Sequence, residues 1–191
     1  MALQLSDVYT SARGSKTCRL RTLDGAGVVY TTAAEEGLTA PFGPSCFDKS
    51  AAVARVNLDV RLDDEGALSY FDGLDKWAVE YLAANSVRLF KRSLTEEQAK
   101  VNYPPCVRRK EGYAPLLHAK IALEGAGDAA HFWDASGVER KPPEDWRNAK
   151  LQLRVHVSHV WLMNSGYGFV INITDVRVLS KAREVAWSCL F

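Results

Sequence analysis

Residues 148–179 constrain the fold more than any other part of the chain, because they contain two long runs rich in β-branched and aromatic residues. In the first run every second residue is apolar or aromatic, with one histidine, and these would share one face: Leu151, Leu153, Val155, Val157, His159, Trp161 and Met163. A period of two is typical of a strand with one buried face. The break at 164–168 contains two glycines, which permit the positive φ of a tight turn. We therefore predict a long antiparallel hairpin over residues 150–179.

The apolar parity changes inside the second run. Ile171 and Ile173 would lie on one side of the strand, whereas Val176 and Val178 follow after Asp175 with the opposite parity. This change predicts a β-bulge, or the loss of one solvated face, near Asp175.

The remaining segments predict further strands on both sides of a helical region. Alternating or β-rich strand candidates occupy residues 18–32, 53–62, 115–123 and 131–134. Between them, residues 71–90 repeat apolar side chains at helical spacing, with Asp72 as the expected N-cap. A second, shorter helix is expected to begin at a capping box at Ser93 or Thr95 and to end near Tyr103.

This order of elements predicts a mainly β fold, an OB-type, partly open antiparallel barrel with a helical insertion at 71–103. The length of 191 residues fits one domain over 1–191. Residues 1–16 are polar and weakly patterned, so we expect a flexible arm or an irregular edge there.

Composition excludes several functional classes. The formal net charge of +1 gives no bulk preference for a polyanion, although a local basic surface remains compatible with it. No apolar run is long enough to span a membrane, and the N-terminal residues lack the apolar core of a signal peptide. The four cysteines form no CxxC pair and are expected to be reduced thiols without metal, in an intracellular compartment (host cytoplasm or nucleus if the protein is viral): Cys18, Cys46, Cys106 and Cys189.

Motifs for catalysis are absent from the sequence. No phosphate-binding glycine loop, nucleophile elbow or metalloprotease motif occurs. His156 and His159 lie three residues apart on a predicted strand, so they would point to opposite faces and make poor joint metal ligands. We predict that the protein is not an enzyme and needs no metal or cofactor.

Cations interleaved with aromatic residues indicate a binding surface. Proteins that bind single strands use cations to follow the phosphates and aromatic rings to stack on bases. The candidate DNA-binding residues are Arg55, Arg61, Lys91, Arg92, Arg108, Arg109, Lys110, Tyr113, Lys120, Trp133, Arg154 and Tyr167. A purely structural role is the alternative for some of these residues. Arg108 to Lys110 would then form a solvated turn. Trp161, which would share a face with Leu151 and Val155, would be a core residue.

A set of short motifs, in order along residues 39–179, carries a resemblance to a known family. They are 39–43 (TAPFG), 84–90 (ANSVRLF), 103–105 (YPP) followed by basic residues, 115–121 (PLLHAKI), 166–168 (GYG) and 174–176 (TDV). In this order the chain resembles the OB-fold single-stranded DNA-binding proteins of T7-like phages and large algal DNA viruses. The resemblance implies a protein that coats single strands during replication or recombination. It departs from the phage proteins at 181–191, where Glu184 is the one acidic residue in place of an acidic tail.

The expected partner is single-stranded DNA, bound without sequence preference in replication, recombination or repair. Replication proteins and further copies of the chain are additional candidate partners. Two alternatives stay open at the level of sequence: a structural β-barrel or jelly-roll subunit of a coat-like assembly, and a small enzyme on a β-barrel.

Overall fold

The computed structural model describes residues 2–33, 37–45, 55–123, 129–163 and 166–180. Eleven strands of this part of the chain belong to one sheet. In chain order the strands are β1 (Leu3–Leu5), β2 (Tyr9–Thr10), β3 (Lys16–Thr22), β4 (Val28–Thr31), β5 (Leu38–Ala40), β6 (Arg55–Arg61), β7 (Val107–Arg108), β8 (Leu116–Ala122), β9 (His131–Trp133), β10 (Ala149–Met163) and β11 (Gly166–Ser180). The helices are α1 (Glu65–Ala84), α2 (Ser86–Phe90) and α3 (Glu96–Val101).

Five strands close into a ring, which confirms the mainly β, OB-type fold. Around the ring β10 pairs with β5, β5 with β6, β6 with β8, β8 with β11, and β11 again with β10. Two of the ladders, β11 with β8 and β11 with β9, are parallel. Four of the five ladders of the ring are antiparallel, as predicted. The pattern did not indicate the parallel ladders, because alternation shows which face of a strand is buried and not the direction of its neighbour.

The β10–β11 hairpin is confirmed, and its strands pair from Lys150 with Ser180 to Met163 with Gly166. The predicted bulge is also confirmed: Arg154 opposes Asp175 while Val155 opposes Ile173, so Thr174 is an extra residue in β11. Asn164 and Ser165 of the predicted turn lie outside the described residues.

A second bulge, which the sequence pattern did not indicate, lies in β10. Val157 opposes Ile171 and His159 opposes Val170, which leaves Ser158 as the extra residue. The buried side chains of β10 therefore have odd residue numbers up to Val157 and even residue numbers after the bulge, at Val160 and Leu162. The expectation that Leu151 through Met163 share one face was wrong beyond Val157, because one inserted residue exchanges the two faces of a strand.

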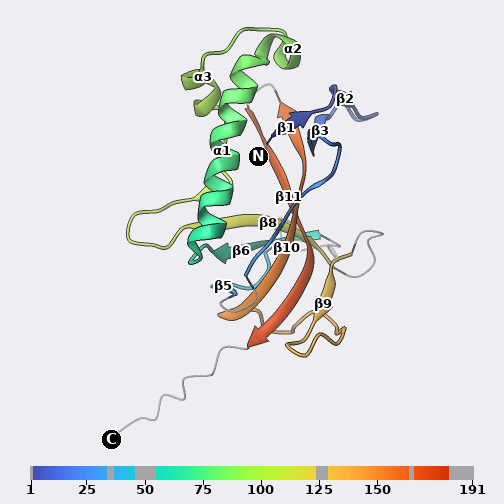
Figure 1. The fold of residues 1–191 in the computed structure, drawn as a ribbon, viewed down its shortest axis with the longest axis vertical. Helices are drawn as coiled ribbons and strands as arrows, with labels where there is room; N and C mark the ends of the chain where they lie inside the picture. Colours follow the sequence, from blue (N-terminus) through green and yellow to red (C-terminus); the bar gives the residue numbers. More distant parts are fainter. Residues whose placement is uncertain (1, 34–36, 46–54, 124–128, 164–165, 181–191) are drawn as a thin grey trace, which may run out of the picture.

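Helix α1 begins earlier than predicted and lies alongside the β10–β11 hairpin (Figure 1). Its N-cap is Asp64, whose carboxylate accepts hydrogen bonds from the backbone N–H groups of Gly66 and Ala67 at 2.9 and 3.2 Å. The expected cap, Asp72, instead lies within the helix, because Asp64 offers the same side chain at the end of the preceding strand. The predicted capping box at Thr95 is confirmed, with Gln98 as its partner.

Residues 2–16 contain strands despite their polar composition. Strand β1 pairs with β3, and Leu3 and Leu5 contribute to the hydrophobic core. Of the two alternatives, an edge describes this segment, because β1 is the terminal strand of the sheet and its two alternating leucines bury one face.

Two cysteines, Cys18 and Cys106, are buried free thiols. Cys46 and Cys189 lie outside the described residues, so for them the expectation of reduced thiols remains a prediction. None of the helices within the described ranges is long and apolar enough to cross a membrane.

Asp75 joins α1 to the segment before β7. Its carboxylate accepts hydrogen bonds from the Tyr103 hydroxyl at 2.6 Å and from the backbone N–H groups of Cys106 and Val107 at 2.9 and 3.3 Å. Burial, followed by the charges of Cys106 and Asp75, raises the pKa of Tyr103 far above its ordinary value, so its hydroxyl stays protonated and donates.

We predict that Asp75→Ala destabilises the protein by about 2–4 kcal/mol, because it leaves several partly buried donors without an acceptor. The free energy of unfolding in urea measures this loss. Glu80→Ala is the matched control on the same helix, since Glu80 forms only an exposed pair with Lys76, and it should change stability by less than about 0.5 kcal/mol. Equal effects of the two substitutions would show that Asp75 does not hold α1 in place.

Candidate nucleic-acid interface

The outward side of β10 is a continuous row of polar and aromatic side chains. Ala149, Leu151, Leu153, Val155 and Val157 are buried on the inner side before the Ser158 bulge, and Val160 and Leu162 after it. The alternate residues, none of them buried, form the row on the other side: Arg154, His156, Ser158, His159, Trp161 and Met163. The bulge thus brings Trp161 and Met163 to the same side as Arg154 and His156, which strict alternation would not do.

The Ser158 hydroxyl anchors this bulge to β11. It lies 2.8 Å from His159 Nδ1 and 3.3 Å from the Val170 carbonyl oxygen, and it accepts a hydrogen bond from Asn172 Nδ2 at 3.1 Å. These contacts satisfy the Ser158 hydroxyl, which thereby links His159 and Asn172.

Neighbouring strands add cations to the row. His156 opposes Asn172 of β11, which opposes Lys120 of β8, which in turn opposes Asn57 of β6. On the other edge of β10, His159 opposes Arg19 of β3. We name this set the basic strip, defined by Arg19, Lys120, Arg154, His156 and His159.

The surroundings of the two histidines of the basic strip lower their pKa values and so favour the neutral form. Partial burial lowers the pKa of His159, and Lys120, His156, Arg19 and Arg55 lower it further. Burial and the Arg154 guanidinium likewise lower the pKa of His156. In both cases nearby positive charge adds to the effect of burial, and a bound anion would oppose that electrostatic contribution.

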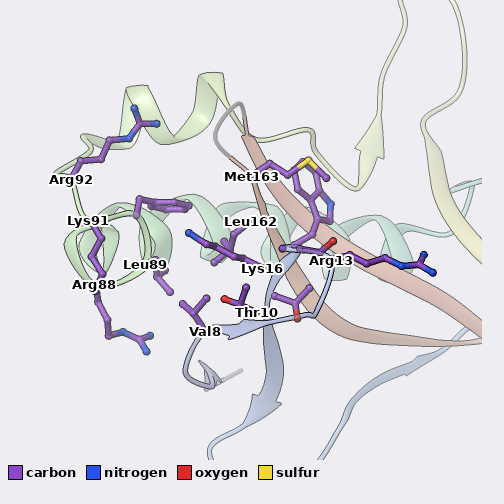
Figure 2. A pocket seen from close by; sticks show the side chains of 15 residues that line it. Val8, Thr10, Arg13, Lys16, Arg88, Leu89, Lys91, Arg92, Leu162 and Met163 are labelled. Carbon is purple, nitrogen blue, oxygen red and sulfur yellow. The ribbon is translucent and has the colours of Figure 1, made fainter.

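A groove lies at one end of the row, between α2 and the β2–β3 hairpin, with a volume of about 790 Å³. Figure 2 shows Arg88, Lys91 and Arg92 on the helix side of this groove, with Lys16 and Leu162 between them and Met163. Phe90 and Trp161 also line it, and none of its fifteen described lining residues is acidic. The α2 groove therefore combines cations with aromatic surface, as a site for a polyanion with aromatic rings requires.

A recess of about 690 Å³ lies at the other end of the row, where β9 meets β11 and β10. We name it the Trp133 recess. Arg154 and His156 of β10 line it together with Val29, His131 and Trp133. The rings of Trp133 and His131 stack with their centroids 6.2 Å apart.

The structure brings five of the predicted site residues to this surface. Lys120 and Arg154 belong to the basic strip, Lys91 and Arg92 line the α2 groove, and Trp133 lines the recess. Lys91 ends α2 in the left-handed region, with a φ of 59°.

Four other predicted residues lie in or beside the β7–β8 hairpin, away from the row. Arg109 forms an ion pair with Asp72 of α1 at 2.6 Å. The ammonium group of Lys110 lies over the ring of the exposed Tyr113, 4.9 Å from its centroid. Arg108 is the last residue of β7 and opposes Leu116, which lies four residues and about 13 Å from Lys120 along β8.

The two predicted arginines of β6 lie at opposite ends of that strand. Arg55 opposes Ala122, near the Lys120 end of β8. Arg61 opposes Leu116 and is held by an ion pair with Asp63 at 3.0 Å, far from the row.

Tyr167 is not a stacking ring, contrary to the prediction. Its side chain is 2% exposed, and its hydroxyl donates to the carbonyl oxygen of Ala99 in α3. Its position beside glycines indicated a loop, whereas Tyr167 belongs to the inner face of β11 and packs near Phe90 and Tyr103.

Sequence reasoning missed Trp161 and His159, which it assigned to the apolar face. The expectation that His156 and His159 point to opposite faces was wrong for the same reason, the Ser158 bulge. One signal was present: Val160 and Leu162 continue an apolar series of opposite parity immediately after Ser158.

Within the described ranges, no three His, Cys, Asp or Glu side chains gather as they would around a metal ion. No protein-family model matches the sequence. No curated protein matches it at a significant level either.

Solved structures do match. The fold matches gp2.5, a single-stranded DNA-binding protein encoded by bacteriophage T7, over 84% of this chain and 96% of gp2.5, with a TM-score of 0.51 and 13% sequence identity. The single-stranded DNA-binding protein from bacteriophage Enc34 matches over 98% of this chain and 96% of its own, with a TM-score of 0.46 and 8% identity. The chain therefore shares the fold of gp2.5.

We predict that the free protein loses stability as the pH falls below about 6.5. Because the folded-state pKa values of His156 and His159 are lowered from 6.5, the unfolded chain binds more protons in this range. Urea denaturation at pH 7.5 and pH 5.5 measures the loss. The double variant His156→Gln, His159→Gln should lose less stability over the same interval, and an undiminished loss would assign the effect to other groups.

Proposed function

We propose that this protein binds single-stranded DNA without a defined recognition sequence and acts in replication, recombination or repair. The observation that carries the proposal is the continuous outward row of β10, which joins the Trp133 recess, the basic strip and the α2 groove.

The chemistry of this surface suits a single strand. Arg154 of β10, Arg19 of β3 and Lys120 of β8 can follow a phosphate backbone. Trp133 and Trp161, near the two ends of the row, can stack on unpaired bases. From Arg154 to Met163 the row extends for about 30 Å, nine steps of about 3.3 Å each. A path of that length fits the short site, about 4–16 nucleotides, that one OB fold covers.

The comparison with gp2.5 supports the same function, since gp2.5 is a single-stranded DNA-binding protein with this fold. Fold alone does not determine function, so the residues of the row carry the argument. Replication proteins and further copies of the chain are the additional partners that we propose.

The first test removes charge from the basic strip. Lys120→Ala with Arg19→Ala should weaken binding to oligo-dT and flatten the slope of log affinity against log salt by about 1.4, because each lost phosphate contact contributes about 0.7. The matched control, Arg108→Ala with Lys110→Ala, removes the same charge from the β7–β8 hairpin and should change the slope less. A larger effect of the control would move the proposed site to that hairpin. If the wild-type protein did not bind oligo-dT even at low salt, a structural assembly subunit would replace this proposal.

The second test removes a stacking ring. Trp133→Ala should weaken oligo-dT binding by about 1–3 kcal/mol and leave the salt slope nearly unchanged, because stacking releases no counterions. Fluorescence titration at several salt concentrations measures both quantities. A fall in the melting temperature of the free protein, with unchanged affinity, would instead show that Trp133 supports the fold.

A further inference from the structure

We propose that the Trp133 recess holds one nucleobase of the bound strand and prefers a base with an exocyclic amine, such as cytosine, over thymine. This inference rests on the proposed single-stranded DNA binding and adds a graded preference at one position of the site.

The walls of the recess suit a flat ring. Trp133 and His131 present stacked rings at an interplanar angle of 30°, and Val29 exposes 42% of its surface there. Gly27 lies so close to His156 that a Cβ on it would be 3.3 Å from His156 Nε2, so glycine at this position lets the imidazole lie close to the backbone of the recess. Apolar and aromatic surface of this kind binds bases by stacking.

Two carboxylates line the same recess, which distinguishes it from the basic strip. Asp175 accepts a hydrogen bond from Thr174 Oγ1 at 2.8 Å and lies 3.9 Å from an Arg154 nitrogen. Glu139 lies 3.1 Å from His131 Nδ1. Carboxylates would repel a phosphate in the recess, whereas an uncharged base meets no such repulsion.

The polar groups of the recess favour some bases over others. An ionised carboxylate only accepts hydrogen bonds, and a guanidinium only donates them. Cytosine can donate its N4 amine to Asp175, as it does to acidic side chains in DNA recognition. Its adjacent ring nitrogen, N3, can accept a hydrogen bond from Arg154. Thymine places the acceptor O4 where cytosine carries its amine, so it would face the carboxylate with a lone pair.

The experiment compares oligo-dC, oligo-dT and oligo-dU of equal length in titrations at pH 8, where cytosine is uncharged. The wild-type protein should bind oligo-dC about fivefold more tightly than oligo-dT, the lower end of the discrimination that such a pairing provides. Oligo-dU should bind like oligo-dT, which excludes an effect of the thymine methyl group. Asp175→Asn should bring the ratio of the dC and dT affinities close to one, because an amide offers both a donor and an acceptor.

The matched control is Asp63→Asn, which makes the same charge change at a carboxylate outside the recess and should keep the wild-type ratio. Glu139→Gln provides a second variant within the recess, should Asp175→Asn fail to fold. Equal binding of oligo-dC and oligo-dT by the wild-type protein would overturn this inference and leave the proposed function intact. The same conclusion would follow if both recess variants kept the wild-type ratio of dC to dT affinity. Absence of binding to all three oligonucleotides would overturn the proposed function itself.

Discussion

One extra residue in β10, Ser158, determines which side chains of the central hairpin face outward. Without it, the alternation that buries Val157 would also turn Trp161 and Met163 inward and leave the outward row without an aromatic ring after His156. The hydroxyl of Ser158 and the amide of Asn172 stabilise the bulge by hydrogen bonds across the two strands. The continuity between the Trp133 recess and the α2 groove therefore depends on a local irregularity of the backbone.

The helical region supports this arrangement from the inner side of the hairpin. Trp77 of α1 stacks against Phe169 of β11, and Tyr167 of the same strand is bound to α3 through its hydroxyl. Asp75 joins α1 to the segment that leads into the β7–β8 hairpin. Helix α2, which follows α1 directly, is thereby held beside the β2–β3 hairpin, and this helix with the two residues after it supplies Arg88, Lys91 and Arg92 to the α2 groove. The α2 groove is thus formed by α2 and the β2–β3 hairpin, and the Trp133 recess by β9 and its neighbours, at the two ends of the β10–β11 hairpin.

The sequence was sufficient for the fold class, the β10–β11 hairpin, the bulge near Asp175 and the capping box at Thr95. These features follow from short-range patterns that record burial and backbone geometry. The parallel ladders of β11 could not be predicted, because alternation does not encode strand direction. The site was only partly predictable. The basic residues were predicted from their clustering in the sequence, which does not show that Arg109 is paired with Asp72. Trp161 was assigned to the core face from strict alternation, which the Ser158 bulge reverses.

The central claim is that a single strand lies along the outward row of β10. Photo-crosslinking of the wild-type protein to an oligonucleotide that carries 5-iododeoxyuridine, followed by identification of the modified residues, tests it most directly. The account predicts crosslinks at Trp133 and Trp161, both suppressed by an excess of unlabelled oligo-dT. Specific crosslinks confined to Tyr113 in the β7–β8 hairpin, with none at either tryptophan, would contradict it.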